Sequence, residues 1–502
     1  MKKLRHIIVT GFCSVVILTS ACNKFLEKAP DNRTELNTPD NVRSLLATAY
    51  PQGGYQQMTE TMSDNARDKG ASQQKNIMDS TFYNWQDFIS DDGTPDSPTA
   101  YWTACYAAIA AANAALDAIS HTSDSADYAA SKGEALVCRA YAHFMLVTLF
   151  AKPYSATTSA SDPGIPYVTA PEKIVYGKYT RGTVKGVYDN IEKDLLAGLP
   201  LIDDQSYKVP KYHFTKVAAR AFAARFYLYK KDYQKVVDYA TQAFPGNTLI
   251  NNMRPWLTQY ATMTVSVFQQ TYTKATENAN LLLVETPSLW ARTYTSTRYG
   301  FAPYMYNVFF PSTSVVGTGT GSRWAQSQFI YIRGGQSNYF VPKWNEYFYT
   351  PDDPNYGYPY IMAPLFTTEE VLFNRAEANI YLGNNDAALS DLNTYISQRL
   401  RNYTVNDNLT VTKATTYYGT DAQTSLINSL LFLKRIEFIQ EGMRWFDNLR
   451  YSTEVKHVRF SDNDVTAQIP RDTISLSSTS NARQWQIPQS AISAGIPANP
   501  RP

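Results

Sequence analysis

The sequence predicts a mainly α-helical protein in which two helical regions flank a large, loop-rich insertion. Three observations support this prediction. Apolar residues recur every three or four positions through much of the first half of the chain, and again from residue 367 onward, as in amphipathic helices. The stretch between them lacks this period and is rich in Thr, Ser, Pro, Gly and aromatic residues. After a signal segment, residues 1–21, the predicted regions are 22–245, 246–363 and 364–502.

The first 22 residues show the pattern of a bacterial lipoprotein signal. A basic start, an apolar run over residues 7–18 and the small residues Thr19-Ser20-Ala21 precede Cys22. This is the order of a secretory signal, and the apolar run is too short to span a bilayer comfortably. We expect cleavage before Cys22, acylation of its thiol and a mature chain tethered to a membrane by lipid. The alternative is an ordinary cleaved signal with a coincidental cysteine.

Helical periodicity recurs several times before the insertion. The predicted helices are residues 40–50, 100–119, 128–150, 184–196, 216–229 and 233–244. Cys105 and Cys138 fall on apolar faces of these patterns, so we expect buried thiols rather than a disulfide. No apolar run after Cys22 has the length expected of a membrane span.

A polar, turn-rich stretch, residues 52–98, separates the first two helical patterns. It contains Asp91, Asp92 and Asp96, and clustered carboxylates are the ligands that a hard cation such as Ca²⁺ takes. Their order lacks the EF-hand spacing, so we expect a solvated turn and keep a structural calcium ion as the alternative. We expect no other cofactor.

The insertion contains a run of alternating glycines, residues 317–321, which indicates a mobile loop. No Gly-Lys-Ser/Thr follows this run, so the sequence does not predict a phosphate-binding loop.

A degenerate repeat links the two helical regions. Ala224-x-x-Tyr227-Leu228-x-x-x-Asp232 matches Ala378-x-x-Tyr381-Leu382-x-x-x-Asp386 position for position. This pattern is typical of tetratricopeptide helix pairs, in which small residues let neighbouring helices approach closely. We expect Thr367 and Glu370 to form a capping box, Gly383 to end the helix that follows, and Asp386 to cap the next one.

Residues 426–450 form the last long helical pattern. Its charged residues recur at three- and four-residue separations, which predicts a solvated helix crossed by salt bridges. These residues are Arg435, Glu437, Glu441, Arg444, Asp447 and Arg450. Gly442, close to Trp445, indicates a bend.

The same segment resembles a known family. Arg435-x-Glu437-Phe438 followed by Glu441-Gly442-x-Arg444-Trp445-x-Asp447-x-x-Arg450 resembles the C-terminal signature of the SusD/RagB family, outer-membrane nutrient-binding lipoproteins of Bacteroidetes. Other segments resemble the family in the same order along the chain: Pro30-Asp31-Asn32-Arg33-Thr34, Ser63-Asp64-Asn65, Trp102-x-x-x-Tyr106-x-x-Ile109-x-x-x-Asn113, Arg375-Ala376-Glu377-Ala378 and Asn499-Pro500-Arg501.

The resemblance implies a fold and a role. The fold is an irregular tetratricopeptide-like scaffold with long loops and short strands on one side. The role is that of a cell-surface lipoprotein, anchored to the outer membrane through Cys22. It captures an oligosaccharide and delivers it to a SusC-like TonB-dependent transporter. Members of the family bind nutrient without chemistry, so we expect no enzyme activity.

Composition and motifs are compatible with binding rather than catalysis. The net charge of +2, from 46 basic and 44 acidic residues, gives no electrostatic case for nucleic acid. The sequence contains no His-Glu-x-x-His zinc pair and no Gly-x-Ser-x-Gly nucleophile elbow. A glycosidase with paired carboxylates stays open, because spacing along the chain does not show which carboxylates face each other.

Glycan binding needs a flat aromatic surface for the C–H face of a sugar and fixed polar groups for its hydroxyls. The polar stretch after the first helix offers both, and Trp85 is the expected platform. Its candidate residues are Asp64, Asn65, Arg67, Asp68, Tyr83 and Trp85. The alternative for Asp64 and Asn65 is a turn-capping role.

The insertion offers a second candidate place for glycan. Its candidate residues are Trp290, Tyr299, Arg323 and Trp324. We expect Trp324 to be the exposed ring, because it lies beside the glycine-rich loop and loops on a rigid scaffold carry function.

Three other functions fit the same architecture. A peptide-binding uptake lipoprotein, as in the RagB branch, would line its groove with partners for backbone N–H and C=O groups. A surface glycosidase would release new reducing ends from its polysaccharide. A structural lid without a ligand would tolerate replacement of the candidate rings.

Overall fold

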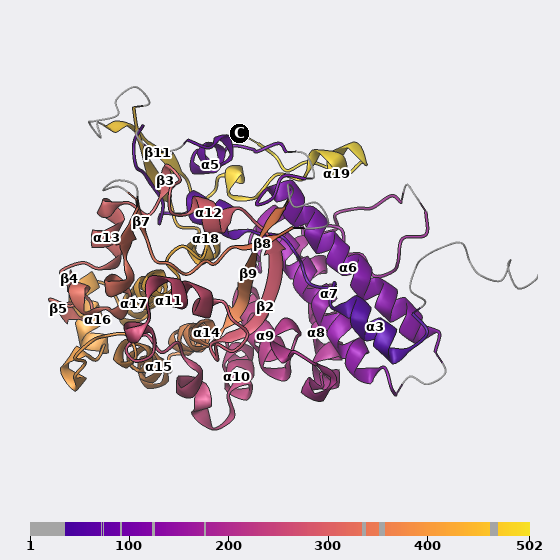
Figure 1. Ribbon diagram of the computed structural model, residues 1–502, viewed down its shortest axis with the longest axis horizontal. Coiled ribbons are helices and arrows are strands. Elements are labelled where there is room, and N and C mark those ends of the chain that lie inside the picture. Colours follow the sequence, from indigo (N-terminus) through magenta and orange to yellow (C-terminus); the bar gives the residue numbers. More distant parts are fainter. Residues whose placement is uncertain are drawn as a thin grey trace, which may run out of the picture.

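The computed structural model describes residues 36–71, 73, 75–90, 93–122, 126–174, 177–333, 338–350, 357–461 and 470–501. It is mainly α-helical, with short strands between the helices, as predicted (Figure 1). The expected lipidation site Cys22 and the family-like segment 30–34 lie outside the described residues.

Most helices of the N-terminal region follow the predicted ones, but two lie in the stretch 52–98, for which turns and no helix were predicted. The helices are α3 (Pro39–Leu46), α4 (Gln56–Met62), α5 (Ile77–Tyr83), α6 (Pro98–Ser120), α7 (Ala129–Phe150), α8 (Val184–Gly198), α9 (Lys216–Lys230) and α10 (Tyr233–Ala243). Side-chain caps set several starts: Ser97 Oγ accepts a hydrogen bond from Ala100 N, and Pro98 occupies the first turn of α6.

Helix α7 is the buried core of this region. Residues 133–150 are all buried, and the guanidinium of Arg139 donates to both carboxylate oxygens of Asp194 at 2.7 Å, so its buried charge is compensated. Among the described residues, α6 and α7 are long and apolar enough to cross a membrane, so the expectation that no such run follows Cys22 was wrong. The qualifying part of α7 lies entirely inside the protein. Cys105 and Cys138 are free and buried, as predicted.

A small antiparallel sheet crosses the middle of the molecule (Figure 1). It consists of β2 (Asn280–Pro287), β9 (Tyr358–Thr367) and β8 (Tyr347–Tyr349), in the order β2-β9-β8. Glu285 lies opposite Met362, and Tyr347 lies opposite Tyr360. Because alternate residues of a strand share a face, this register puts all four side chains on one face of the sheet.

The other elements of the insertion are short, as the resemblance implies. The helices are α11 (Val265–Tyr272), α12 (Trp290–Thr293) and α13 (Pro303–Phe309). Two-residue strands pair as β1 (Arg67–Asp68) with β3 (Tyr299–Gly300), β4 (Thr313–Ser314) with β5 (Gly317–Thr318), and β6 (Tyr331–Ile332) with β7 (Tyr339–Phe340). The start of the glycine-rich run thus belongs to a small hairpin.

The C-terminal region is helical up to residue 450 and then forms a hairpin. Its elements are α14 (Thr368–Tyr381), α15 (Asn385–Ser397), α16 (Val411–Tyr418), α17 (Ala422–Glu437), α18 (Met443–Arg450), β10 (Val455–Phe460), β11 (Pro470–Leu476) and α19 (Gln489–Ser493). In Figure 1 the early helices α3, α6, α7 and α8 form the right side, and α13, α15, α16 and α17 form the left side.

The degenerate repeat corresponds to two helix pairs, α9–α10 and α14–α15, and α14 packs against both α9 and α10. Asp232 caps α10 through Lys235 N, and Thr367 caps α14 through Glu370 N. The predicted cap at Asp386 was wrong: Asn384 is the N-cap of α15, and Asp386 lies in the first turn, where a carboxylate favours the helix dipole.

The last helical pattern is broken into α17 and α18. Gly442 adopts a left-handed conformation (φ 74°) between them, which confirms the predicted bend. The prediction of a solvated helix was wrong, because the carboxylates of this segment are buried and its arginines are half-buried. These charged side chains pair with residues far away in the sequence: Arg450 with Glu377 of α14, Arg444 with Asp64, and Glu441 with Lys343.

The turn at Gly442 closes on helix α4, near the other end of the chain. The buried Glu60 carboxylate accepts hydrogen bonds from Gln440 N at 3.2 Å and from Gly442 N at 3.0 Å. Just beyond α4, both carboxylate oxygens of Asp64 accept from Arg444, at 2.7 and 2.9 Å. We call these contacts the α4 clamp.

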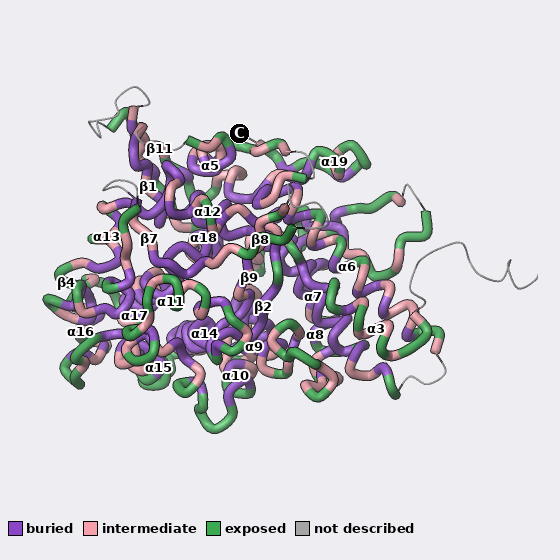
Figure 2. The backbone as a smooth tube through the Cα atoms, in the orientation of Figure 1, coloured by how far each residue is buried: buried purple, intermediate pink, exposed green. Residues whose placement is uncertain are grey.

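The core runs continuously through the molecule. Figure 2 shows buried backbone through α7, α9, α14, β2 and β9, whereas the exposed segments lie at the periphery. One hydrophobic cluster includes residues of both helical regions and of the insertion, such as Phe144, Trp324 and Trp445. The insertion therefore packs as part of the fold.

We predict that Gly442→Ala destabilises the protein more than Gly419→Ala does. Both glycines have positive φ (74° and 66°), but a Cβ at Gly442 would collide with Thr59 Oγ1, whereas Gly419 has open space around it. Backbone strain alone costs about 1 kcal/mol, and the collision adds to it at Gly442. Urea unfolding of both variants measures the difference; equal losses would contradict the close packing of the α4 clamp.

We also predict a pH-dependent contribution from Glu60. Burial raises the pKa of Glu60 from its ordinary 4.5 to about 7, against the opposing effect of the Gly442 and Gln440 N–H groups. The folded state therefore binds this proton more tightly than the unfolded state. The stabilisation is complete below pH 4.5 and is lost as pH rises through 7, by on the order of 3 kcal/mol. Urea unfolding between pH 5 and 8 should show a flatter profile for Glu60→Gln; an unchanged slope would refute this assignment.

Candidate functional site

Most residues of the first predicted group form hydrogen bonds or ion pairs within the protein. Asn65 Oδ1 accepts from Arg435 Nε at 2.9 Å, next to the Asp64–Arg444 pair. Burial raises the pKa of Asp64, but the guanidiniums of Arg435 and Arg444 outweigh it and hold the pKa well below its usual range. The side chains of Asp64 and Asn65 therefore bind the protein's own arginines, which favours a structural role for them over the predicted role of chelating sugar hydroxyls.

Asp68 also binds partners within the protein. It is buried, and its carboxylate accepts from Arg298 Nε at 2.7 Å and from Phe460 N at 2.8 Å. Arg67, by contrast, is half-buried, and its guanidinium lies over the exposed ring of Tyr304, 4.4 Å from the centroid. Of this group, Arg67 alone keeps a charged group near the surface without an ion pair among the described residues.

The predicted platform Trp85 belongs to a buried column of four stacked rings. Trp85, His457, Tyr83 and Tyr299 lie in that order, with centroids 4.4, 4.0 and 4.4 Å apart. Trp85 Nε1 also donates to Met62 O at 2.9 Å. The column joins the N-terminal loop, the insertion and strand β10. The exposure expected of Trp85 was wrong, because the residue is 8% exposed and His457 covers one face of its ring.

The second predicted group is also buried. Trp324 is 0% exposed and Trp290 1% exposed, so the expectation that Trp324 is an exposed stacking ring was wrong. Arg323 forms a bidentate pair with Asp407, both N–O distances being 2.8 Å. Apolar packing explains the burial of Trp324, whose ring lies against Tyr395 and Phe432.

A different surface has the features that the sequence analysis required. A cleft of about 560 Å³ lies over β2 and β9, beside the short helix η3 (Pro210–Tyr212). A second hollow of about 480 Å³ adjoins it, since Tyr50 and Gln52 line both. Tyr358, which is exposed, lines the second hollow. We call the two together the sheet cleft.

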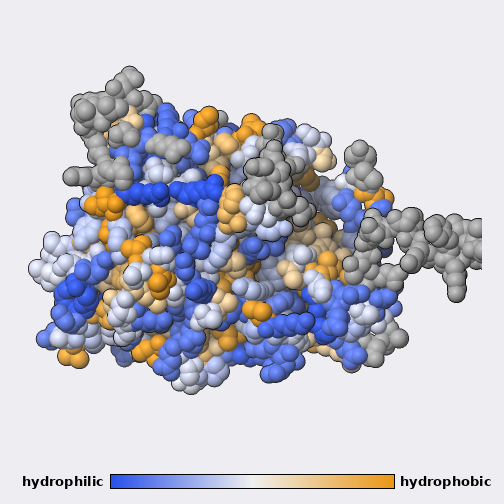
Figure 3. Space-filling model, viewed as in Figure 1, coloured by the Kyte–Doolittle hydropathy of each residue, from blue (hydrophilic) through white to orange (hydrophobic). Residues whose placement is uncertain are grey.

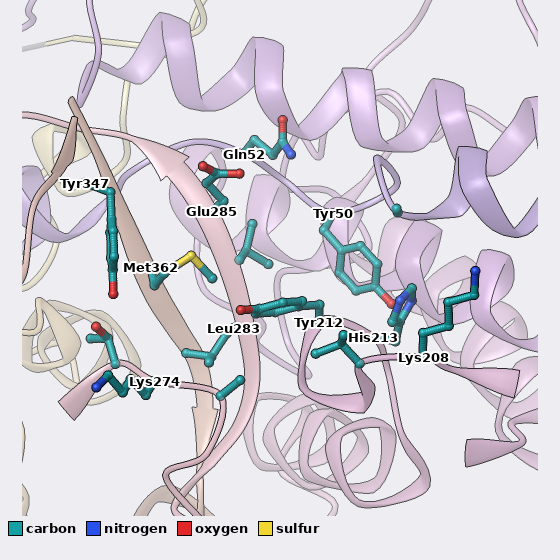
Figure 4. A pocket seen from close by; sticks show the side chains of 15 residues that line it. Tyr50, Gln52, Lys208, Tyr212, His213, Lys274, Leu283, Glu285, Tyr347 and Met362 are labelled. Atoms are coloured by element: carbon teal, nitrogen blue, oxygen red, sulfur yellow. The ribbon is translucent and has the colours of Figure 1, made fainter. Parts of the chain in front are cut away.

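Two half-exposed tyrosines stand on opposite sides of the larger hollow. Tyr347 of edge strand β8 is 40% exposed and Tyr212 of η3 is 41% exposed. Figure 4 shows Met362, Leu283 and Glu285 between these rings. The arrangement gives an apolar floor with an aromatic ring at each side, which suits a ligand with flat apolar faces.

Polar side chains without protein partners surround this floor. The described lining side chains that make no hydrogen bond or ion pair include Gln52, Lys208, Lys274 and Glu285. They offer an amide, two ammoniums and a carboxylate to a ligand. Figure 3 shows this face of the protein as a mixture of hydrophilic and hydrophobic residues.

One wall of the sheet cleft is held by a buried hydrogen-bond network. Tyr50 donates to Glu134 Oε1 at 2.6 Å and accepts from Phe214 N at 2.8 Å. His213 Nδ1 lies 2.7 Å from the same Glu134 oxygen. Burial raises the pKa of Tyr50 well above its ordinary value, so the phenol stays a neutral donor. The network fixes residue 213, directly after Tyr212, and so orients that ring.

The described residues contain no group of three or more His, Cys, Asp or Glu side chains that could hold a metal ion. Of the calcium candidates, Asp91 and Asp92 lie outside the described residues. Asp96 is buried, and its carboxylate accepts from Ser288 Oγ and Leu289 N, both at 2.7 Å.

The sequence analysis missed both tyrosines of the sheet cleft. A usable signal was present at β8: Tyr347, Phe348 and Tyr349 are three consecutive aromatics, and alternation along a strand puts rings on both faces. Tyr212 carried no such signal, because it is a lone tyrosine two residues after Pro210.

We predict a large loss of stability for Trp85→Ala and a small change for Tyr347→Ala. Removing the buried, stacked Trp85 ring should lower the free energy of unfolding by about 3–5 kcal/mol. Removing the exposed Tyr347 ring should change it by about 0.5 kcal/mol or less. Urea denaturation tests both, and a Trp85→Ala variant as stable as the wild type would show that the ring column is not part of the core.

Comparison with family models matches nearly the whole chain. A model described as "Starch-binding associating with outer membrane" (SusD-like) matches residues 24–228, and the model of the SusD family matches residues 251–495. A search of curated proteins gave no match.

Solved structures show the same fold. A SusD superfamily protein from Bacteroides thetaiotaomicron VPI-5482 has a TM-score of 0.66 at 20% identity, covering 92% of this chain and 100% of its own. A SusD-like carbohydrate binding protein from Bacteroides vulgatus ATCC 8482 has a TM-score of 0.65 at 15% identity, covering 91% and 96%. A SusD superfamily protein from Bacteroides fragilis has a TM-score of 0.61 at 18% identity, covering 90% and 96%.

The resemblance inferred from the sequence motifs is thus confirmed by both halves of the chain and by the fold. The α4 clamp explains several of those motifs, since Ser63-Asp64-Asn65 binds the arginines of the C-terminal signature. The chain belongs to the SusD/RagB family.

Proposed function

We propose that this protein captures an oligosaccharide in the sheet cleft and delivers it to a SusC-like TonB-dependent transporter. In this proposal it acts at the cell surface, anchored to the outer membrane through lipid on Cys22. Membership of the SusD/RagB family supports a role in carbohydrate binding and nutrient uptake. The sheet cleft supplies the place for the sugar.

The observation that carries the proposal is the pairing of exposed rings with free polar groups. Tyr212 and Tyr347 offer ring faces to the C–H faces of a sugar. Gln52 and Glu285 line the same hollow with unused hydrogen-bonding capacity among the described residues. Sugar recognition needs both features at once. The predicted residues around Trp85 and Trp324 lack exposed ring faces, because their rings are buried.

The carboxylates of the cleft support binding without catalysis. A glycosidase needs two carboxyl groups facing each other across the scissile bond. Among the described residues, Glu285 is the one carboxylate that lines the larger hollow. Asp96 lines the smaller one, but it is buried and its oxygens are used by Ser288 and Leu289.

We predict that Tyr347→Ala and Tyr212→Ala each weaken glycan binding about fivefold. One stacking contact contributes about 1 kcal/mol, which corresponds to that factor. Native gels cast with starch, dextran, xylan, pectin or arabinogalactan measure the retardation of the chain from Asn23 onward. The matched control is Tyr417→Ala, since Tyr417 of α16 is 46% exposed and does not line the cleft.

The other outcomes separate the alternatives. Retardation that survives the Tyr212→Ala/Tyr347→Ala double variant would place the sugar elsewhere on the protein. Unaltered mobility across the whole panel would favour a peptide cargo or a lid without a ligand. New reducing ends in the polysaccharide would identify a glycosidase.

A further inference from the structure

A second cavity lies where the two copies of the sequence repeat meet. Its volume is about 360 Å³, and it is bordered by the α9–α10 turn, the end of α14, the end of α18 and the loop after α7. Five half-buried tyrosines line it: Tyr154, Tyr229, Tyr233, Tyr381 and Tyr451. We call it the tyrosine bowl. It shares no lining residue with the sheet cleft.

The rings of the tyrosine bowl are held rigidly. Tyr233 and Tyr381 stack with centroids 4.3 Å apart and planes 7° apart, so the two helix pairs contact each other through these rings. The guanidinium of Arg450 lies 5.2 Å from the Tyr229 centroid and 5.1 Å from the Tyr451 centroid. A rigid aromatic wall needs no ordering when a ligand enters, which favours binding.

The buried charges behind the tyrosine rings cancel within the protein. Arg450 donates to both oxygens of Glu377, at 2.6 and 3.0 Å, and to Asp447 at 2.7 Å. Lys434 donates to the same Asp447 oxygen at 2.7 Å. Two cations and two carboxylates thus compensate each other behind the tyrosine rings. Lys231, exposed at the rim, is the further charged residue among those that line the cavity.

Neutral hydrogen-bonding groups remain available there. Within the described part of the chain, the hydroxyls of Tyr154 and Tyr229 have no hydrogen-bond partner. The Tyr451 hydroxyl is used, since it donates to Glu377 at 2.6 Å. Ser452, exposed at the rim, adds one further hydroxyl. The bowl therefore combines ring faces with hydroxyls and compensated charge.

We propose that the tyrosine bowl is a second binding site, for a single neutral sugar ring. A sugar ring presents C–H faces to aromatic walls and hydroxyls to phenols, and it carries no charge that would need a counterion. A charged ligand would meet the Arg450–Glu377 pair already satisfied. This site is independent of the proposed capture of oligosaccharide in the sheet cleft.

Saturation-transfer NMR with monosaccharides tests the proposal. The probes are D-glucose, D-galactose, D-mannose, N-acetyl-D-glucosamine and L-rhamnose, each at millimolar concentration with the chain from Asn23 onward. At least one should receive saturation from the wild type, and Tyr233→Ala should weaken its affinity at least tenfold. Tyr229→Phe, which keeps the ring and removes a free hydroxyl, should weaken it two- to fivefold.

Controls distinguish this site from the sheet cleft. Tyr417→Ala, which lies outside both sites, should leave monosaccharide transfer unchanged, and transfer should persist in Tyr347→Ala. Tyr229→Phe should leave gel retardation by polysaccharide unchanged. The proposal is overturned if no sugar receives saturation from the wild type, or if Tyr347→Ala abolishes the transfer. If Tyr233→Ala fails to fold, the Tyr229→Phe variant decides, and unchanged affinity in it overturns the assignment.

Discussion

The α4 clamp is the contact on which the closure of the whole chain depends. It brings the carboxylates of Glu60 and Asp64 to partners at residues 440–444, about 380 positions later in the sequence. A buried carboxylate without partners costs several kcal/mol, so these groups define which surfaces must meet. Glu60 binds backbone N–H groups that only a turn at Gly442 presents, and Asp64 binds a guanidinium in bidentate geometry. The requirement is therefore one of shape as well as charge.

The sequence was sufficient to predict helices but not their partners. Apolar period, capping residues and the matched Tyr-Leu turns predicted α6 to α10 and α14 with small errors at their ends. The charge pattern of residues 435–450 led to the wrong prediction of a solvated helix. Three- and four-residue spacing fits a solvated helix, and it fits equally well a helix whose charged side chains pair with residues distant in sequence. Arg450 illustrates this: it pairs with Asp447 three residues away and also with Glu377 on another helix.

The candidate glycan residues show the same limit for aromatic side chains. Tryptophan in a polar stretch can equally be a surface platform or the centre of a local core, and Trp85 is the latter because His457, from the far end of the chain, covers its face. Conversely, Tyr347 lies in the exposed edge strand β8 and stays 40% exposed. Exposure follows from tertiary packing, which residue type and neighbouring polarity do not encode.

Arg139, which forms the buried ion pair of α7 with Asp194, also affects how this segment would partition into a membrane before folding. Helix α7 has the length and hydropathy of a membrane span, in a sequence that begins with the pattern of a secretory signal. A translocation machinery sorts such segments by their insertion free energy, and one central arginine raises that energy by about 3 kcal/mol. Arg139 lies at the middle of α7. In a chain exported as proposed, this side chain would oppose the arrest of the α7 segment in the lipid bilayer before it meets Asp194.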